Sequence, residues 1–320
     1  MNRAHYPFRV AVVGTGRVGS TFAYALLLRG LVSEIILIDK DKAKAEGEAM
    51  DLSQTVPFTH PTQIRVGEYK DCEQAAVIVI AAGVHPQKGE SLLDAIKRNV
   101  SLMREVVPQI CRYNKDAVLL VATQPVDLMT YAAYKISRRA AHKVCGFGTL
   151  ADTARLRELL GIHYGIAPHN IHAYIIGEQG KGEVPVWSLA NITSMQLKDF
   201  CFTNGIDYDQ KALDDLFRRA RDESYQIIER KGALYFAVGA GLLGIVEAIL
   251  KNQKQVFCVS SLIENYYGIS DVCLSLPAVI GTNGVEKVLR LELNHQEIAG
   301  LRQSAEFLKA NLAKLALEAR

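Results

Sequence analysis

The stretch FRVAVVGTGRVG, residues 8–19, decides the fold of this chain. Its first half is short, apolar and rich in β-branched residues, which is typical of a strand buried on both faces. Its second half has the spacing G-x-G-x-x-G and opens an apolar helix that extends to Arg29. The chain returns as a second apolar strand at 34–38 and stops on Asp39, about twenty residues after the turn. This order predicts a strand–turn–helix–strand unit that binds a dinucleotide.

Each part of this unit has a physical task. Gly14 allows the tight turn, Gly16 lets a pyrophosphate approach the backbone, and Gly19 lets helix and strand pack closely. The N-terminus of the helix offers free N–H groups to phosphates. The carboxylate of Asp39 can accept both hydroxyls of an adenosine ribose and would repel a 2′-phosphate. An ordinary glycine turn would not need that acid, so we expect a NAD site.

Composition sets the class of protein. A chain of 320 residues exceeds one typical core, so two packed lobes are expected. Hydrophobic residues make up 49% and charged residues 22%, as in soluble globular proteins. The net charge of +3 forms no basic block, which argues against nucleic acid and anionic membranes as partners.

Cysteine usage and the apolar runs point to the cytoplasm. The six cysteines show no C-x-x-C or Cys/His metal spacing, so we interpret them as small core residues in a reducing compartment and expect no metal site. The chain runs almost directly into its first strand, which leaves no room for a signal peptide. The longest apolar run, 232–246, is shorter than the ~20 residues of a membrane span and is expected to be a buried helix.

Strands alternate with helices through residues 1–146, which predicts an α/β fold, a doubly wound parallel sheet of the Rossmann type. We expect further strands at 63–66, 75–81, 117–122 and 143–146, and helices at 40–52, 91–114 and after Pro125. The polar loop 84–90 has the composition of a mobile lid. A second, α+β domain is expected over 147–320, with helices around 152–157, 208–228, 233–250 and 296–317 and strands at 171–176 and 256–262.

The motifs of the chain resemble, from end to end, those of the L-lactate/malate dehydrogenase family, and most closely its bacterial-type L-lactate dehydrogenases. The matching stretches are 14–19, 47–52, 82–83, 89–91, 125–127, 148–149, 152–155, 172–178, 183–187 and 274–277. The resemblance implies an NAD-binding domain followed by a substrate domain. Beyond the glycine turn and Asp39, the cofactor-binding positions that it implies are Val18, Lys44, Tyr69, Gly83, Ala122 and Phe147. Lys44 either lies under the adenine rim or is a solvated lysine.

The catalytic positions implied by the resemblance are altered. The family's proton-exchanging histidine corresponds to Gln179, while the aspartate that holds its ring is retained as Asp152. An amide can donate a hydrogen bond but cannot act as a general base. The loop arginine that polarises the substrate carbonyl corresponds to Leu92, which has no charge. The sequence therefore predicts a degenerate site for oxidation of a hydroxy acid.

Other positions of the substrate pocket differ as well. The family's asparagine ahead of Pro-Val-Asp is Gln124, the serine facing the nicotinamide is Phe147, and a pocket threonine is Leu234. Pro86 stands where the family chooses between lactate and malate, and its ring offers no recognition of a dicarboxylate. Arg155 is retained at the position that grips the substrate carboxylate. Alternatively, Arg155 pairs with Asp152 and only holds the helix.

Two further residues match an effector site. Arg157 and His172 correspond to positions that bind fructose 1,6-bisphosphate at a subunit interface in allosteric bacterial lactate dehydrogenases; alternatively, both are plain surface groups. The helix at 47–52 resembles the family's dimerisation helix, and its apolar residues would otherwise need cover within the monomer. We therefore expect a homodimer, or a homotetramer if the anion site faces an interface.

Three hypotheses of function follow. The first is a divergent NAD-dependent oxidoreductase acting on a small carboxylated substrate, with the proton supplied by water, by the substrate, or by His85, Lys181 or Tyr235. The second is an inactive NAD(H)-binding pseudoenzyme. The third is a partner subunit retained for its surface. If the ring of Phe147 filled the nicotinamide pocket, hydride transfer would be blocked and the oxidoreductase hypothesis would be excluded.

Overall fold

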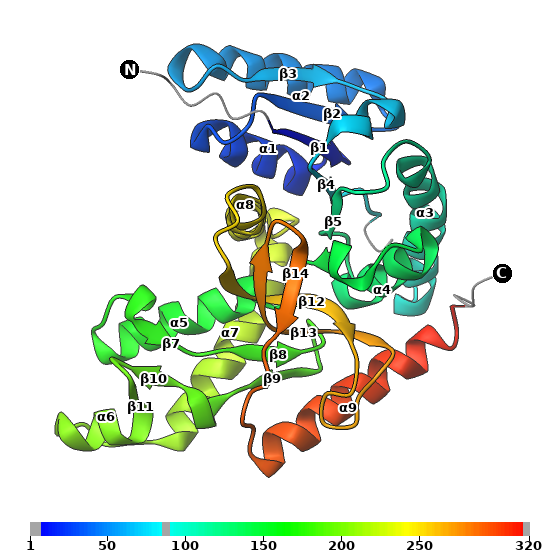
Figure 1. Ribbon diagram of the computed structural model, residues 1–320. Coiled ribbons are helices and arrows are strands. Elements are labelled where there is room, and N and C mark those ends of the chain that lie inside the picture. The colour runs from blue at the N-terminus through cyan, green and yellow to red at the C-terminus, as the bar shows by residue number, and fades with distance from the viewer. Residues whose placement is uncertain (1–7, 85–89, 316–320) are drawn as a thin grey trace.

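The computed structural model describes residues 8–84 and 90–315. The first half of the chain forms a six-stranded parallel sheet in the order β3-β2-β1-β4-β5-β6 (Figure 1). Its strands are β1 (Arg9–Val13), β2 (Glu34–Ile38), β3 (Gln63–Val66), β4 (Val77–Ile80), β5 (Val118–Val121) and β6 (Val144–Gly146). This is the strand order of a Rossmann fold, so the predicted fold class is confirmed.

The same sheet continues into the second half of the chain with antiparallel strands. The path runs from β6 through β12, β13 and β8 to β9, and β14 pairs with β13. These strands are β8 (Ile175–Gly177), β9 (Glu183–Pro185), β12 (Gln255–Ile263), β13 (Val272–Gly281) and β14 (Gly284–Val288). A separate small sheet contains β7 (Ile171–His172), β10 (Asn191–Ile192) and β11 (Met195–Gln196).

Helices cover the sheet, and local sequence fixes their ends. The α-helices are α1 (Arg17–Arg29), α2 (Lys42–Thr55), α3 (Leu92–Tyr113), α4 (Val126–Ser137), α5 (Leu150–Tyr164), α6 (Leu197–Thr203), α7 (Gln210–Lys231), α8 (Phe236–Leu250) and α9 (His295–Leu312). Asn294 and Glu297 form a capping box at the start of α9. Gly232 ends α7 in the left-handed conformation that glycine adopts without strain.

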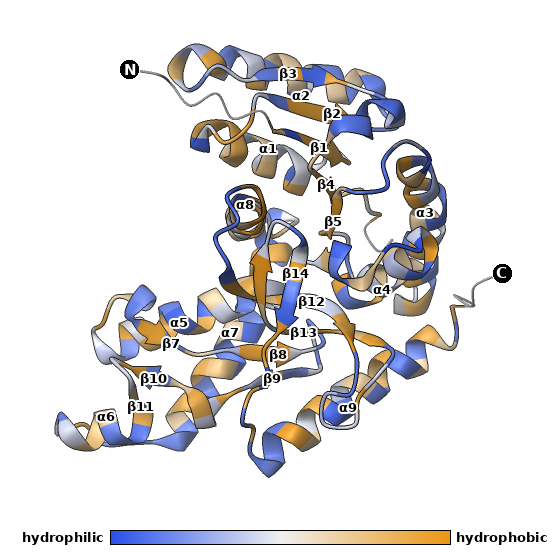
Figure 2. Cartoon of the chain, in the orientation of Figure 1, coloured by the Kyte–Doolittle hydropathy of each residue, from blue (hydrophilic) through white to orange (hydrophobic). Residues whose placement is uncertain are grey.

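Alternating side chains of the parallel strands enter two cores. Ala11 and Val13 join the core beneath α3 and α4, whereas Val10 and Val12 join the core beneath α1 and α8. The central strands are accordingly hydrophobic along their length in Figure 2. The first strand is buried on both faces, as its β-branched sequence predicts.

Two sequence expectations for the second half are corrected. The strand expected at 171–176 is split into β7 and β8, which belong to different sheets, so its alternation of apolar residues conceals a change of sheet. The ten-residue β13 was not expected at all, although it is the antiparallel centre of this region. Among the described residues, no single helix is long and apolar enough to cross a membrane; α7 and α8 pass that test only as a pair bent by 117°.

Candidate cofactor and substrate site

The glycine turn after β1 has the geometry that the sequence predicts. Gly14 has φ +97°, and a Cβ there would lie 2.3 Å from the backbone nitrogen of Ala82. A Cβ on Gly19 would lie 1.9 Å from the carbonyl oxygen of Gly14, so α1 packs against the turn only with glycine there. Nothing lies within 4 Å of the corresponding point at Gly16. That open space, in front of the N-terminus of α1, suits a pyrophosphate.

Asp39 is held as an ionised carboxylate at the end of β2. Its Oδ2 accepts hydrogen bonds from the Thr15 backbone N–H (2.7 Å) and hydroxyl (3.1 Å), and its Oδ1 accepts from the Asp41 N–H (3.0 Å). Burial by itself raises the pKa of Asp39, but these donors outweigh burial, and the pKa is lowered. A fixed anion here suits ribose hydroxyls and disfavours a 2′-phosphate.

Two adjoining cavities form a cleft at the carboxyl ends of β1, β4 and β5. The cavity beside β2 is lined by Asp39, Lys44, Tyr69 and Gly83 among others. The cavity beside α1 is lined by Val18, Gly83, Ala122 and Gln124 among others. The cleft thus brings together cofactor positions that are far apart in the sequence. An open glycine turn, a fixed carboxylate and a cleft at this sheet edge fit NAD.

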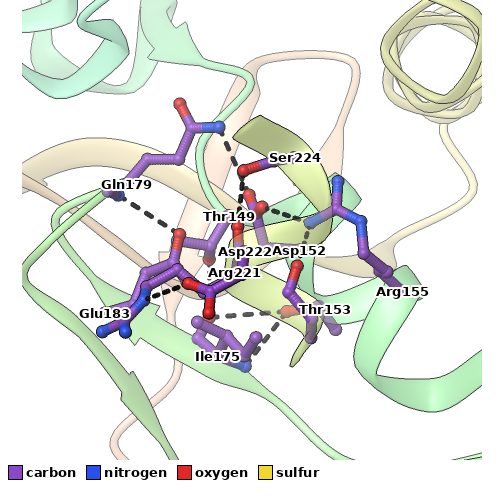
Figure 3. A network of polar contacts seen from close by, with 12 residues as sticks. Thr149, Asp152, Thr153, Arg155, Ile175, Gln179, Glu183, Arg221, Asp222 and Ser224 are labelled. Atoms are coloured by element: carbon purple, nitrogen blue, oxygen red, sulfur yellow. Dashed lines mark hydrogen bonds and ion pairs between the residues drawn. The ribbon is translucent and has the colours of Figure 1, made fainter. Parts of the chain in front are cut away.

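Asp152 links the other predicted site residues in a buried network (Figure 3). Its Oδ1 accepts from Nη1 of Arg155 at 2.9 Å, and its Oδ2 accepts from Nε2 of Gln179 at 3.2 Å. Nη1 of Arg155 also donates to the carbonyl oxygen of Ala220 in α7, at 2.6 Å. Arg155 therefore pairs with Asp152, as one of the two alternatives predicts. Nε and Nη2 of Arg155 have no hydrogen-bond partner in the described part of the chain, and neither atom is fully buried.

The segment that carries Gln179 is anchored through its backbone. The Gln179 N–H donates to Oδ2 of Asp127 at 2.8 Å, and the Ser275 hydroxyl donates to Oδ1 of Asp127 at 3.1 Å. Burial raises the pKa of Asp127 to about 6, although these hydrogen bonds oppose the rise. The side-chain Oε1 of Gln179 is buried without a hydrogen-bond partner in the described residues. Nε2 of this amide therefore donates to Asp152, whereas Oε1 is left without a hydrogen-bond donor among the described residues.

Two carboxylates flank this segment. Burial raises the pKa of Glu178 to about 7; the Gly182 N–H, which donates to its Oε2 at 2.7 Å, opposes the rise. Burial, and then the negative charge of Asp152, raise the pKa of Glu183 well above its ordinary value. Sequence reasoning treated these two acids only as parts of family motifs. The sequence feature that could have identified Glu178 and Glu183 is their position on either side of a glycine-rich turn. In the folded chain Asp152 adds a third carboxylate to this group.

Other predicted positions have different outcomes. Phe147 is only 1% exposed and packs in the core, where a Cβ on Gly241 would lie 2.6 Å from its ring. Its predicted cofactor contact is corrected, because a side chain with so little free surface cannot touch a ligand in the cleft. Leu234 is half-buried against the same core. Tyr235 lies under the ammonium of Lys231, whose Nζ is 3.5 Å from the ring centroid.

Some expectations fall outside what the structure describes. Pro86 and His85, together with most of the expected lid loop, lie outside the described residues. Leu92 begins α3, but its side chain is also outside the description.

For the predicted anion site and the predicted dimerisation helix, the structure gives the positions of the residues, and both functions stay predictions. Nε of Arg157 donates to the carbonyl oxygen of Ala173, at 3.0 Å, which places this arginine next to the exposed His172. In α2, Ala49 and Leu52 have within the monomer the cover that they need if no partner subunit covers them. Met50 is 66% exposed and keeps its apolar surface free.

A Rossmann sheet with this glycine turn, fixed acid and cleft defines a NAD-binding oxidoreductase. Comparison with known proteins then gives the family. Residues 8–146 match the lactate/malate dehydrogenase NAD-binding domain, and residues 149–318 match the α/β C-terminal domain of the same family. This chain belongs to the lactate/malate dehydrogenase family.

Relatives and solved structures agree with this assignment. The chain is 45% identical to an L-lactate dehydrogenase of Acetivibrio thermocellus, covering 97% of this chain and 98% of that one. An L-lactate dehydrogenase of Clostridium botulinum is 41% identical, over 95% and 96% of the two chains. The crystal structure of MGS-M5, a lactate dehydrogenase from a Medee basin deep-sea metagenome library, superposes with a TM-score of 0.94 at 39% identity, over 97% and 99%. A minor L-lactate dehydrogenase of Enterococcus mundtii gives 0.94 at 33% identity, over 98% and 100%.

Proposed function

We propose that this protein is an NAD-dependent oxidoreductase that acts on a small carboxylated substrate by chemistry other than the oxidation of lactate or malate. The observation that carries the proposal is the free edge of Arg155. Within residues 8–84 and 90–315, Arg155 donates only through Nη1, to Asp152 and to Ala220, so the Nε and Nη2 edge can bind a carboxylate side-on. The retained cleft and this edge support binding of both cofactor and substrate.

The proposed chemistry excludes proton exchange by Gln179. NAD supplies hydride transfer when it is bound, but oxidation of an alcohol also needs a base for the hydroxyl proton. Gln179 donates its amide hydrogen to Asp152 and cannot take up that proton. A substrate whose carbon is already activated, such as an imine, would need no such base. The proton would then come from water, from the substrate, or from a residue such as Lys181.

The second candidate is an NAD(H)-binding pseudoenzyme, or a partner subunit. It is favoured by the pairing of Arg155 with Asp152, because the guanidinium charge is already compensated in a buried network. The burial of Phe147 leaves the oxidoreductase hypothesis open, because this ring packs in the core and does not line the cleft.

Activity measurements test the proposal. With NAD(H), the protein should show no appreciable lactate or malate dehydrogenase activity, because loss of a general acid–base group alone costs about 10²–10⁴-fold in rate. A screen of NADH oxidation with small 2-oxo and 2-imino acids should find a substrate whose turnover is lost in Arg155→Ala. Steady pyruvate reduction by the unmodified protein would refute the proposed chemistry. NADH binding without turnover of any carboxylate would favour the pseudoenzyme.

Restoration of the family residues is a second test. Gln179→His combined with Leu92→Arg and Gln124→Asn should recover weak pyruvate reduction, whereas either of the first two changes alone should not. A base without a polarising group leaves the transition state short of stabilisation. Full activity from Gln179→His alone would contradict this reasoning.

We also propose the finer features of its organisation. The boundary between the NAD-binding and substrate domains is placed at 146/147, and the protein is assigned to the cytoplasm. Exposed Met50 on α2 supports a homodimer, and the proximity of Arg157 to His172 supports an anion site for fructose 1,6-bisphosphate in a homotetramer.

A further inference from the structure

Arg17 stands at the entrance of the cofactor cleft with most of its hydrogen-bonding capacity unused. It is the first residue of α1, directly after Gly16, and its exposed side chain lines the cavity beside that helix. Nη1 donates to the carbonyl oxygen of Lys231 at 3.0 Å. Across the described ranges, Arg17 has no other hydrogen bond and no carboxylate partner. A guanidinium has five N–H donors, so the Nε and Nη2 edge is available to a ligand.

The carbonyl that Arg17 contacts belongs to the last turn of α7. Unsatisfied carbonyls at a helix C-terminus attract a cation, which favours the contact of Arg17 with the Lys231 carbonyl. A Cβ on Gly232 would lie only 2.4 Å from Nη1 of Arg17, so glycine at this position makes room for the guanidinium. Gly232 also has φ +85°, and Ala233 follows it as a wall of the same cavity. The guanidinium of Arg17 therefore lies beside Gly232, at the start of the α7–α8 connection.

The N-terminus of α1 provides the complementary half of an anion site. Its first turn contains no acidic side chain, and Gly16 makes no side-chain cap, so the positive end of the helix is not neutralised locally. The space beside Gly16 is open. An anion placed there would face both the helix N–H groups and the guanidinium of Arg17. A diphosphate is the part of NAD that matches this charge.

We propose that Arg17 binds the pyrophosphate of NAD(H) and thereby couples occupancy of the cofactor cleft to the α7–α8 connection, residues 232–235. Nη1 keeps its bond to the Lys231 carbonyl while Nε and Nη2 donate to phosphate oxygens. A single side chain then bridges the cofactor and the segment that carries Ala233 and Leu234. Cofactor binding orders that segment, which borders the proposed substrate site.

Binding measurements on the intact protein test this role. NADH and ADP-ribose contain the pyrophosphate, whereas adenosine does not. Arg17→Gln should raise the Kd of NADH and of ADP-ribose about tenfold, the low end for a charge-assisted hydrogen bond at an exposed site, and should change the Kd of adenosine less than about twofold. Arg17→Lys should recover part of the loss, since it restores charge without the fork. Arg230→Gln, which removes an exposed charge one residue from Lys231, is the matched control and should leave all three values unchanged.

Hydrogen exchange tests the coupling. ADP-ribose should slow amide exchange at 232–235 in the unmodified protein and in Arg230→Gln, but not in Arg17→Gln at a concentration that saturates the variant. Equal protection in Arg17→Gln would overturn the coupling. Unchanged NADH affinity, an equal loss for adenosine, or an equal loss in Arg230→Gln would overturn the pyrophosphate contact. None of these measurements depends on turnover, so they stand apart from the test of the proposed reaction.

Discussion

Neutralising Glu178 should change how the stability of the protein depends on pH. Burial raises the pKa of Glu178 in the folded protein to about 7, from an ordinary value of 4.5. Between these two values the folded state holds a proton that the unfolded state releases. The free energy of unfolding therefore falls as pH rises, and the contribution of Glu178 is complete below its unfolded pKa and lost above its folded pKa.

The size of the effect follows from the shift. Each pKa unit corresponds to about 1.4 kcal/mol, so a rise from 4.5 to about 7 is worth on the order of 3 kcal/mol. Most of this, roughly 2 kcal/mol, is lost between about pH 5 and pH 8. Glu178→Gln should remove this share of the decline. The neutral amide can still accept the hydrogen bond that the Gly182 N–H donates to Oε2.

Urea denaturation of both proteins at several pH values, at one protein concentration, measures the effect. Because the amide mimics the protonated carboxyl group, the two curves of unfolding free energy against pH should lie close together below about pH 5 and separate as pH rises, with Glu178→Gln the more stable by roughly 2 kcal/mol near pH 8. Asp127 and Glu183 also have raised pKa values and keep some decline in the variant. Glu306→Gln removes an exposed carboxylate on α9 and should follow the unmodified protein. Parallel curves for Glu178→Gln and the unmodified protein would refute the assignment of a raised pKa to Glu178.

Two other predictions concern ligands and assembly. Because Asp39 is held as an anion by Thr15 and Asp41, NADH should bind far more tightly than NADPH in fluorescence titrations, and equal affinities would contradict the proposed ribose contact. Light scattering at micromolar concentration should show a dimer or tetramer, and fructose 1,6-bisphosphate should raise the melting temperature in the unmodified protein but not in Arg157→Ala; a monomer with no shift would remove both the assembly and the anion site.

Local sequence signals predicted the cofactor half of the molecule well. The glycine turn, the two apolar strands and Asp39 each depend on backbone chemistry within about thirty residues. The second half was harder, because its sheet pairs β6 with β12 and β13 with β8, which are distant in sequence. No local periodicity records such pairings. The split of the strand expected at 171–176 has the same cause.

The same limit applies to the site: the sequence gives the identity of each residue, but the direction of its side chain depends on residues that are distant in the sequence. The sequence alone led to the prediction that Gln179 cannot act as a general base. It could not show which way Arg155 points, because that depends on Ala220, sixty-five residues away on α7. Nor could it show that Phe147 is buried against α8, since a large aromatic residue in a former serine position fits either the pocket or the core.

The proposed replacement of the family histidine by Gln179 would separate a structural role at this position from a chemical one. Nε2 of Gln179 donates to Oδ2 of Asp152 and Nη1 of Arg155 donates to Oδ1, so both oxygens of this buried carboxylate have a donor. The cost falls only on proton exchange, which the amide cannot perform. An apolar residue at this position would instead have left a buried carboxylate short of a donor. The network is therefore compatible with the proposed binding of a carboxylate at the Nε and Nη2 edge of Arg155 and with the proposed hydride transfer that uses no enzymatic base.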